Sequence, residues 1–554
     1  MKNKMKYILK PWLMVAMAAV LLSSCEDELE KYPLDQFANE TFWTTEANAN
    51  LALAAVYRGN ILVNIAEYNP TDWWSYNGLL WLEMATDNAY DRRLENSAVN
   101  RLTNGTLVPN NGILGNYWQR SYERIARCNY FLENIGKTPV SEDKIKRMMA
   151  EARFIRACQY FYMASYWGSV PLVTKNLSAE EANTVTKTTH QELADFVIAE
   201  LTAAANDLPR HSAIPANELG RASKQAALAF LGRMQLFEGK FADATITYKT
   251  IIDFGDNIID PDYSGIFVEA KENSNEHIFS IQKIPALQAN AIMQHHAPNV
   301  LGGFTVLNPL ADLMEAYQFT DGTPFSYTDP RYDYRDIGKN RDPRLKYTIL
   351  YDGAIIRGKR FTSHPDSAQS LDQVQSSVRQ TTQSGYGQRK YIDESFSGNL
   401  QNGYGGNFPI VRYAEILLSY LEAKMEAEGA VTQADLNMTI NLVRSRASVN
   451  MPPISVTSAT QLRPILRNER RVELALEGLR LWDILRWKVG ETELRGDFYG
   501  HPYPVAKRAI RKKNAAAPVD PFRRWFVTTK NFRTQDYFWP IPQGEVNINP
   551  SLGQ

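Results

Sequence analysis

Aromatic and polar side chains are concentrated in one turn-rich segment, residues 68–76, which reads Tyr-Asn-Pro-Thr-Asp-Trp-Trp-Ser-Tyr. A pyranose ring stacks its apolar C–H faces on Trp or Tyr, while its hydroxyl groups need Asp, Asn, Gln or Arg nearby. This segment offers both kinds of group. We therefore predict that Trp73, Trp74 and Tyr76 contact a ligand. The alternative is that Trp73 and Trp74 pack against the start of a helix.

No catalytic motif accompanies these rings. The seven histidines form no His-x-x-x-His or His-Glu-x-x-His pair, so the sequence does not support a helical zinc site. A Gly-x-Ser-x-Gly elbow and a Walker-type phosphate loop are also absent from the sequence. Glu469, Glu473 and Glu477 share one face of an expected helix, which is unsuitable for flanking a sugar bond from two sides. The sequence predicts a protein that is not an enzyme and has no cofactor.

The charge balance argues against a nucleic-acid partner. Lys plus Arg and Asp plus Glu both total 61, which gives a net charge of zero. Nucleic-acid binders normally show a basic excess or a basic stripe. Aromatic residues make up 11% of the chain, a content compatible with a large core as well as with exposed contact rings.

The first 25 residues have the pattern of an export signal. Several lysines precede an apolar run of 11 residues, Trp12–Leu22, which is well short of the ~20 residues that span a bilayer as a helix. The run ends in Leu22-Ser23-Ser24-Cys25, which resembles a lipobox, where the cysteine is lipidated and becomes the first mature residue. We predict a signal peptide over residues 1–24 and a lipid anchor on Cys25. The alternative is an ordinary secretory signal that contains a cysteine by chance.

Helical patterns dominate most of the remaining chain. Residues 224–252 place a Leu-Gly pair, a small alanine and a late aromatic residue at the spacings of a tetratricopeptide repeat. Cys128 and Cys158 lie in apolar helical patterns and are predicted to be buried free thiols. The other predicted helices cover Thr44–Val63, Tyr117–Ile135, Asp143–Trp167, Tyr413–Glu428, Gln433–Ala447 and Leu462–Trp487.

The helical periodicity fails between residues 254 and 408, where Pro, Gly, Ser, Asn and Gln increase. A stretch of this length without regular helices is usually a functional loop region or an irregular insertion. The predicted fold is mainly α: a tetratricopeptide-like helical scaffold with a loop-rich region that binds the ligand. The predicted parts are an N-terminal helical region (25–253), the loop-rich region (254–408) and a C-terminal helical region (409–554).

Several local motifs, in order along the mature chain, resemble those of the SusD/RagB family of nutrient-uptake lipoproteins. Each motif also has a simple structural use, and we interpret them as parts of the scaffold. For example, Glu477/Arg480 and Asp483/Arg486 have the i,i+3 spacing of surface ion pairs on a helix, worth a few tenths of a kcal/mol each. The motifs are Arg153-Phe154-Ile155-Arg156-Ala157, Gly168-Ser169-Val170-Pro171-Leu172, Gly220-Arg221-Ala222-Ser223-Lys224, Arg341-Asp342-Pro343-Arg344-Leu345, Arg412-Tyr413-Ala414-Glu415, Glu469-Arg470-Arg471 and Trp539-Pro540-Ile541-Pro542.

The resemblance implies a function and a location. Such proteins sit as lids over a SusC-like TonB-dependent transporter in the outer membrane and capture oligosaccharides or, in some members, peptides. The acidic run Glu26-Asp27-Glu28 resembles the export signal of lipoproteins that reach the cell surface, so the protein is expected to be lipid-anchored and to face the cell exterior. Some relatives hold a structural calcium ion, but no Asp-x-Asp-x-Asp loop supports one here.

The resemblance also implies further ligand contacts. The family segment that often reaches the ligand corresponds here to the residues after Thr86-Asp87, and the loop after the strand-like run 278–281 also contributes to the family's site. Arg92 and Arg93 can alternatively be solvated loop charges, and His295 a surface turn residue. The ligand contacts implied in this way are Tyr90, Asp91, Arg92, Arg93, Gln294 and His295.

Overall fold

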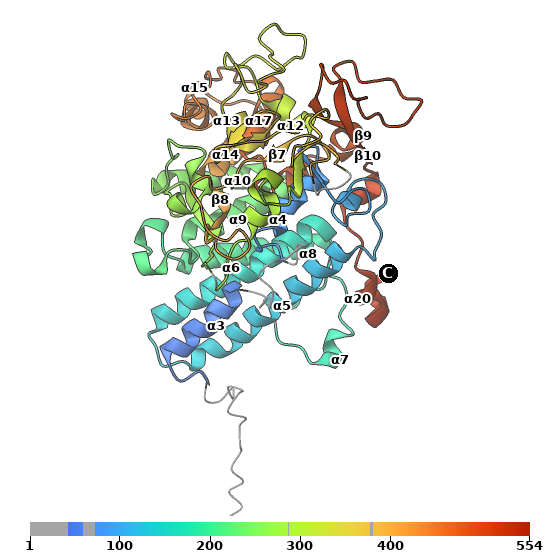
Figure 1. The fold of residues 1–554 in the computed structure, drawn as a ribbon. Helices are drawn as coiled ribbons and strands as arrows, with labels where there is room; N and C mark the ends of the chain where they lie inside the picture. Colours follow the sequence, from blue (N-terminus) through green and yellow to red (C-terminus); the bar gives the residue numbers. More distant parts are fainter. Residues whose placement is uncertain (1–41, 59–71, 286, 377–380, 554) are drawn as a thin grey trace, which may run out of the picture.

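The computed structural model describes residues 42–58, 72–285, 287–376 and 381–553 (Figure 1). The predictions for the signal peptide, Cys25 and Tyr68 lie outside these residues. Long helices form the lower part of the molecule in the view of Figure 1, and the loop-rich segments and the β9–β10 hairpin form the upper part. Among the described residues, no helix combines the length and apolar character that crossing a membrane requires.

Helices from the N-terminal half form the lower layer. An Asn111 side chain caps α5 by accepting a hydrogen bond from the amide of Ile113, and a Thr189–Glu192 capping box starts α8. Gly168, with φ of +77°, ends α6. Cys128 on α5 and Cys158 on α6 are buried free thiols, as predicted. The helices are α3 (Glu46–Arg58), α5 (Gly112–Asn134), α6 (Glu142–Trp167), α7 (Ala179–Ala182) and α8 (His190–Asp207).

The predicted repeat is a helical hairpin of α9 (Lys224–Phe237) and α10 (Phe241–Phe254). Gly239, with φ of +67°, reverses the chain between the two helices. Gly232 lets the helices approach closely, since a Cβ at this position would lie 2.5 Å from Cζ of Tyr248. Helix α14 (Tyr413–Glu428) packs on the other side of α10, so the helical layers continue across the loop-rich segment.

Two predicted helices are each broken into two. The predicted helix 433–447 is interrupted at Thr439 (φ −125°, ψ −100°), and the predicted helix 462–487 is interrupted over residues 474–479. Gly478 adopts φ of +80° and packs directly against Leu79, where a Cβ would lie 2.6 Å from the Leu79 oxygen. Residues of a right-handed α-helix have negative φ, so the helix cannot continue through Gly478. The observed helices are α15 (Gln433–Met438), α16 (Ile440–Arg444), α17 (Ala459–Glu473) and α18 (Arg480–Arg486).

The remaining elements are short. Each strand pairs with one antiparallel partner among the described residues: β1 with β3, β2 with β8, β4 with β7, β5 with β6 and β9 with β10. The strands are β1 (Ala89–Asp91), β2 (His277–Ile281), β3 (Leu307–Pro309), β4 (Ile349–Leu350), β5 (Ile355–Ile356), β6 (Lys359–Arg360), β7 (Gly387–Gln388), β8 (Phe408–Arg412), β9 (Arg495–Pro502) and β10 (Arg524–Asn531). The short helices are α4 (Gly78–Leu82), α11 (Ile292–His296), α12 (Ala311–Ala316), α13 (Arg344–Thr348), α19 (Gly490–Glu493) and α20 (Gln543–Ile548).

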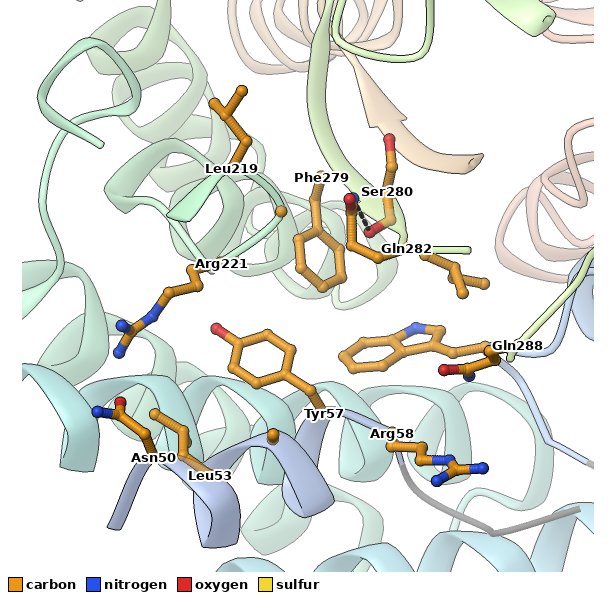
Figure 2. A pocket seen from close by; sticks show the side chains of 14 residues that line it. Asn50, Leu53, Tyr57, Arg58, Leu219, Arg221, Phe279, Ser280, Gln282 and Gln288 are labelled. Carbon is orange, nitrogen blue, oxygen red and sulfur yellow. Dashed lines mark hydrogen bonds between the residues drawn. The ribbon is translucent and has the colours of Figure 1, made fainter. Parts of the chain in front are cut away.

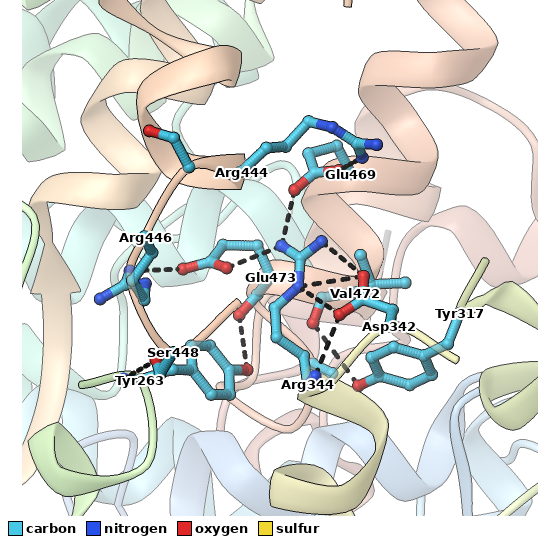
Figure 3. A network of polar contacts seen from close by, with 12 residues as sticks. Tyr263, Tyr317, Asp342, Arg344, Arg444, Arg446, Ser448, Glu469, Val472 and Glu473 are labelled. Atoms are coloured by element: carbon cyan, nitrogen blue, oxygen red, sulfur yellow. Dashed lines mark hydrogen bonds and ion pairs between the residues drawn. The ribbon is translucent and has the colours of Figure 1, made fainter. Parts of the chain in front are cut away.

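A buried ion-pair network connects the loop-rich region to the C-terminal helices (Figure 3). Arg344 on α13 pairs with Asp342 (2.7 Å), Glu469 (2.6 Å) and Glu473 (2.8 Å). Arg412 at the end of β8 pairs with Glu276, Glu473 and Glu477 at 2.7–2.8 Å. We call these residues, with Lys390, Arg444 and Arg446, the arginine network.

This network corrects the predicted surface pairs. Glu477 pairs with Arg412 and Lys390 rather than with Arg480, and Arg480 instead pairs with Asp87 at 2.7 Å. The pair Asp483–Arg486 does form, at 2.7 Å, but both side chains are at most 5% exposed. The sequence spacing predicted solvated pairs because it does not show that loop segments cover this face.

Candidate functional site

Trp73, which the sequence predicts as a ligand contact, is a core residue. Its ring stacks on Tyr117 with centroids 4.0 Å apart, and Tyr162, Tyr166 and Trp539 stack around it. The indole N–H donates to Oγ of Ser121 at 2.8 Å. The side chain has no exposed surface, so it cannot stack on a sugar. The prediction is wrong here, and the packing alternative holds.

Tyr76, Arg93 and His295 come together from distant parts of the chain, with Tyr76 and His295 in the interior and Arg93 partly exposed. The Tyr76 hydroxyl lies 2.5 Å from Nδ1 of His295, and the Arg93 guanidinium lies over Trp81 at 4.5 Å. Tyr76 and His295 are at most 2% exposed. Burial lowers the pKa of His295 to about 4, so the ring is neutral. The prediction that His295 and Tyr76 contact a ligand is therefore wrong, and so is the alternative of His295 as a surface turn residue.

The other implied contacts divide between interior and surface. Tyr90 and Asp91 on β1 are buried, which contradicts their prediction as contacts. Asp91 holds Arg93 through an ion pair of 2.6 Å. Arg92 is half-buried. The side-chain amide of Gln294 donates a hydrogen bond to the backbone carbonyl of Gly302 at 3.1 Å. Of the residues predicted from the resemblance, only Arg92, Arg93 and Gln294 retain exposed surface.

Trp74 reaches a cavity of about 300 Å³ between α3, the 219–221 turn and β2, although only 6% of it is exposed. Figure 2 shows the rings of Tyr57 and Phe279 pointing into this cavity. Two of its polar groups already have protein partners: the Tyr57 hydroxyl donates to Glu151 at 2.7 Å, and Arg221 pairs with Glu151 at 2.7 Å. Groups that are satisfied in this way offer a ligand little new hydrogen bonding.

A second cavity, of about 290 Å³, opens at the loop-rich end, and we call it the loop cleft. The turn before β5, the segment after β6 and the end of β9 build its walls. Half-buried Tyr334 presents an aromatic ring, with the Arg335 guanidinium 4.6 Å from its centroid. The side chains that give the cleft its character are Tyr334, Arg335, Asp352, Arg360, Thr362, His364, His501 and Tyr503.

His501 places a hydrogen-bond acceptor beside the loop cleft. Its Nδ1 lies 2.7 Å from the carbonyl oxygen of Pro502, so Nδ1 carries the proton and donates. Burial lowers the pKa of His501 to about 4, which keeps the ring neutral and leaves Nε2 as an acceptor. Nε2 has no hydrogen-bond partner among the described residues, and the side chain is 3% exposed. This atom is itself buried, so it is an unsatisfied acceptor behind the surface of the cleft and not an exposed contact.

An aromatic cluster adjoins the loop cleft along the chain. Tyr327 stacks on Phe522 with centroids 4.6 Å apart, and Phe325 and Tyr332 pack edge-on against Tyr327. Tyr327 and Tyr332 are half-buried, and Phe522 is 37% exposed. We call Phe325, Tyr327, Tyr332 and Phe522 the ring cluster. Partly exposed rings beside a polar cleft combine the two groups that sugar binding needs.

Sequence reasoning assigned ligand binding to the loop-rich region 254–408, which supplies part of the loop cleft, but it named none of the residues of the cleft. Its residues come from three segments, near 334, 352–364 and 501–505, that share no motif. One signal was present in the sequence: residues 498–519 contain five lysines and arginines and no carboxylate, in a chain with equal totals of both. Among the described residues, no group of His, Cys, Asp and Glu is arranged to hold a metal ion.

Comparisons with known proteins agree on one family. A family model described as "SusD family" matches residues 265–554, and one described as "Starch-binding associating with outer membrane" matches residues 34–236. A SusD-like carbohydrate-binding protein from Bacteroides fragilis shares 46% identity, with 92% of this chain and 100% of that chain covered and a TM-score of 0.89.

More distant relatives extend this result. SusD-like protein P2 from Formosa agariphila is 26% identical over 85% of this chain and 89% of the relative. A laminarin-binding SusD-like protein shares 20% identity and a TM-score of 0.62, over 92% of this chain and 98% of that one, which shows the fold alone. The family and the mainly helical, tetratricopeptide-like fold predicted from the sequence are confirmed.

Proposed function

From the premise that this chain belongs to the SusD family, we propose that it is a non-catalytic protein that binds a glycan in the loop cleft. The observation that carries the proposal is the 46% identity, over 92% of the chain, to a relative described as carbohydrate-binding. The chemistry of the loop cleft supports it, because a ring and several hydrogen-bond donors face one cavity.

Each group in the loop cleft has a distinct use for a sugar. The Tyr334 ring stacks on the C–H face of a pyranose. Arg335 and Arg360 donate to ring substituents. The ring cluster next to the cleft extends the contact surface to a second sugar unit. Glycoside hydrolysis uses two carboxylates, and Asp352 is the one carboxylate among the described residues that line the cleft, which supports capture rather than hydrolysis.

The proposed location is the outer membrane, with a lipid on Cys25 and the protein facing the cell exterior. The family description "associating with outer membrane" supports the membrane assignment. The proposed partner is a SusC-like TonB-dependent transporter that receives the glycan. A Cys25→Ala variant tests the anchor, since it should leave the membrane fraction, and continued partition with normal processing would contradict the anchor.

Affinity electrophoresis in gels containing a panel of polysaccharides tests glycan binding. At least one polysaccharide should retard the wild-type protein, and Tyr334→Ala should weaken that retardation. The matched control is Tyr130→Ala, which removes a 40% exposed tyrosine from α5, far from the cleft. Equal retardation of both variants would remove the loop cleft as the site. A protein that no polysaccharide retards, but that a peptide library binds, would establish the peptide alternative.

A further inference from the structure

Two segments at the loop cleft are rich in cations. Residues 353–365, which include the β5–β6 hairpin, contain Arg357, Lys359, Arg360 and no acidic residue. The loop between β9 and β10 contributes a second basic segment, since residues 498–519 also lack acidic residues. Its cations are Lys507, Arg508, Arg511, Lys512 and Lys513, of which Lys513 pairs with Asp497 at 2.7 Å. Because the whole chain has 61 cations and 61 carboxylates, this concentration is local.

Two carboxylates beside these walls already bind backbone amides. Asp352 accepts from the amides of Ser363 (2.8 Å) and His364 (3.0 Å). Asp366 accepts from the amides of Lys507 and Arg508, both at 2.7 Å, and so fixes the β9–β10 loop beside the β5–β6 hairpin. Both carboxylates therefore organise the walls, and neither forms an ion pair with Arg335 or Arg360.

The cleft-lining arginines are also free of ion pairs within the described part of the chain. Arg335 is exposed and lies over Tyr334, and Arg360 is exposed and donates to the carbonyl of Gly353 at 3.4 Å. No ion pair among the described residues includes either guanidinium, whereas Arg331 and Arg524 nearby each pair with an aspartate. The arginine guanidinium donates two parallel hydrogen bonds to a carboxylate, and it can also donate to the oxygens of a sulfate group.

We propose that the glycan bound in the loop cleft is anionic and carries carboxylate or sulfate groups that Arg335 and Arg360 contact. This inference rests on the proposed function and adds the substrate class. Tyr334 holds the sugar ring, the two arginines hold its anionic substituent, and the exposed lysines and arginines of both walls attract a chain of repeating negative charge.

An anionic membrane surface fits the geometry less well. The first described helix, α3, lies at the bottom of Figure 1, and the β9–β10 hairpin lies at the top, so the basic walls are remote from the end of the molecule that follows the proposed lipid anchor. The basic groups also surround a cavity with a half-buried ring, which suits a sugar chain better than a flat array of lipid headgroups.

Matched pairs of polysaccharides test the proposal. Isothermal titration calorimetry of the full mature protein is performed with polygalacturonate and its fully methyl-esterified form, and with chondroitin sulfate and its desulfated, carboxyl-reduced form. We expect a charged member to bind at least about tenfold more tightly than its uncharged partner, since hydrogen bonds to charged groups contribute about 1.5–3 kcal/mol. Polygalacturonate distinguishes carboxylate recognition from sulfate recognition. Binding should weaken as salt is raised.

Variants locate the effect in the loop cleft. Arg335→Ala with Arg360→Ala should weaken binding of the charged polysaccharide by about tenfold or more, while Arg335→Lys with Arg360→Lys should keep part of it. The charge-matched control is Lys144→Ala with Lys146→Ala, which removes two exposed cations from α6. If the control variant bound the charged polysaccharide as weakly as the cleft variant does, the attraction would be a nonspecific effect of net charge. That result would overturn the proposal.

Other outcomes separate this proposal from the proposed function. Binding confined to neutral polysaccharides such as laminarin or pullulan would overturn the anionic substrate and leave glycan binding intact. Binding to no polysaccharide, charged or neutral, would overturn both. Binding to phosphatidylglycerol vesicles that the cleft variant abolishes, without binding to any charged polysaccharide, would assign the basic walls to a membrane and overturn the anionic glycan.

Discussion

The arginine network and the loop cleft use the same side chain in opposite ways. Arg344 and Arg412 are at most 1% exposed, and each pairs with three carboxylates. Arg335 and Arg360 are exposed and pair with no carboxylate among the described residues. Burial opposes ionisation of Glu473, but Arg446, Arg412 and Arg344 outweigh it and hold the pKa of this carboxyl well below its usual range. A buried arginine whose charge is neutralised by carboxylates stabilises the fold. An exposed arginine that has no carboxylate partner is available to a ligand.

This contrast explains why the family motifs do not reveal the ligand. The Arg-Asp-Pro-Arg, Arg-Tyr-Ala-Glu and Glu-Arg-Arg motifs supply Arg344, Arg412 and Glu469 to the arginine network. The cleft arginines lie in segments without any motif. Several residues of the family motifs connect the loop-rich region to the helices, whereas Arg335 and Arg360 lie outside these motifs.

Replacing Arg412 with alanine should have the largest effect on stability. The variant removes a positive charge that pairs with the buried carboxylates of Glu276, Glu473 and Glu477. Breaking a buried ion pair typically costs about 3–5 kcal/mol of stability. Urea unfolding followed by circular dichroism measures the loss. The control is Lys144→Ala, which removes one partner of the exposed Lys144–Glu46 pair and should cost less than about 1 kcal/mol. Similar losses for the two variants would mean that water compensates the buried carboxylates.

Buried Trp73 and partly exposed Tyr334 show the same contrast between a structural and a ligand-facing side chain. The expected loss of stability is comparable to or smaller than that of Arg412→Ala. Trp73→Ala should lower the free energy of unfolding by about 3–5 kcal/mol, because it empties a site packed by four aromatic rings. Tyr334→Ala should change it by only about 0.5 kcal/mol, as expected for a surface substitution, and should lower glycan affinity instead. Thermal unfolding and affinity electrophoresis on both variants check this. Loss of affinity in folded Trp73→Ala protein would restore the sequence-based site.

The sequence predicted the scaffold well because helix periodicity and small-residue spacings are local properties. The α9–α10 hairpin follows from the Leu-Gly pair and Gly239, and the buried thiols follow from apolar helical patterns. The break at Gly478 was not predictable in this way, because the apolar pattern continues through it and the approach of Leu79 is a tertiary contact.

The functional prediction failed for a related reason. A turn rich in Trp, Asp and Asn has the same local pattern whether its rings face solvent or the core. What buries Trp73 is Trp539, near the other end of the chain, together with rings of α5 and α6. The loop cleft depends on three segments that meet only after folding. Only its charge pattern was visible in the sequence.

His190 is an intermediate case between the two regions, and it gives the smallest expected effect. Its Nε2 lies 2.7 Å from Glu238, with side chains 29% and 11% exposed. The hydrogen bond to Glu238 raises the pKa of His190, so the folded protein binds this proton more tightly than the unfolded chain does. The stability it contributes is therefore fully present below the unfolded pKa of about 6.5 and is lost as pH rises through the folded pKa.

Urea unfolding of wild type and His190→Asn at pH 5.5, 7.0 and 9.0 isolates this contribution. The free energy of unfolding of the wild type should exceed that of the variant at pH 5.5. This difference should be about 0.2–1 kcal/mol larger at pH 5.5 than at pH 9.0, the range expected for a partly exposed pair. Other titrating groups affect both proteins equally and cancel in the difference. A difference independent of pH would show that His190 acts only by packing against Phe237 and Phe538. It would also mean that partial exposure removes the ion-pair stabilisation that the buried arginine network retains.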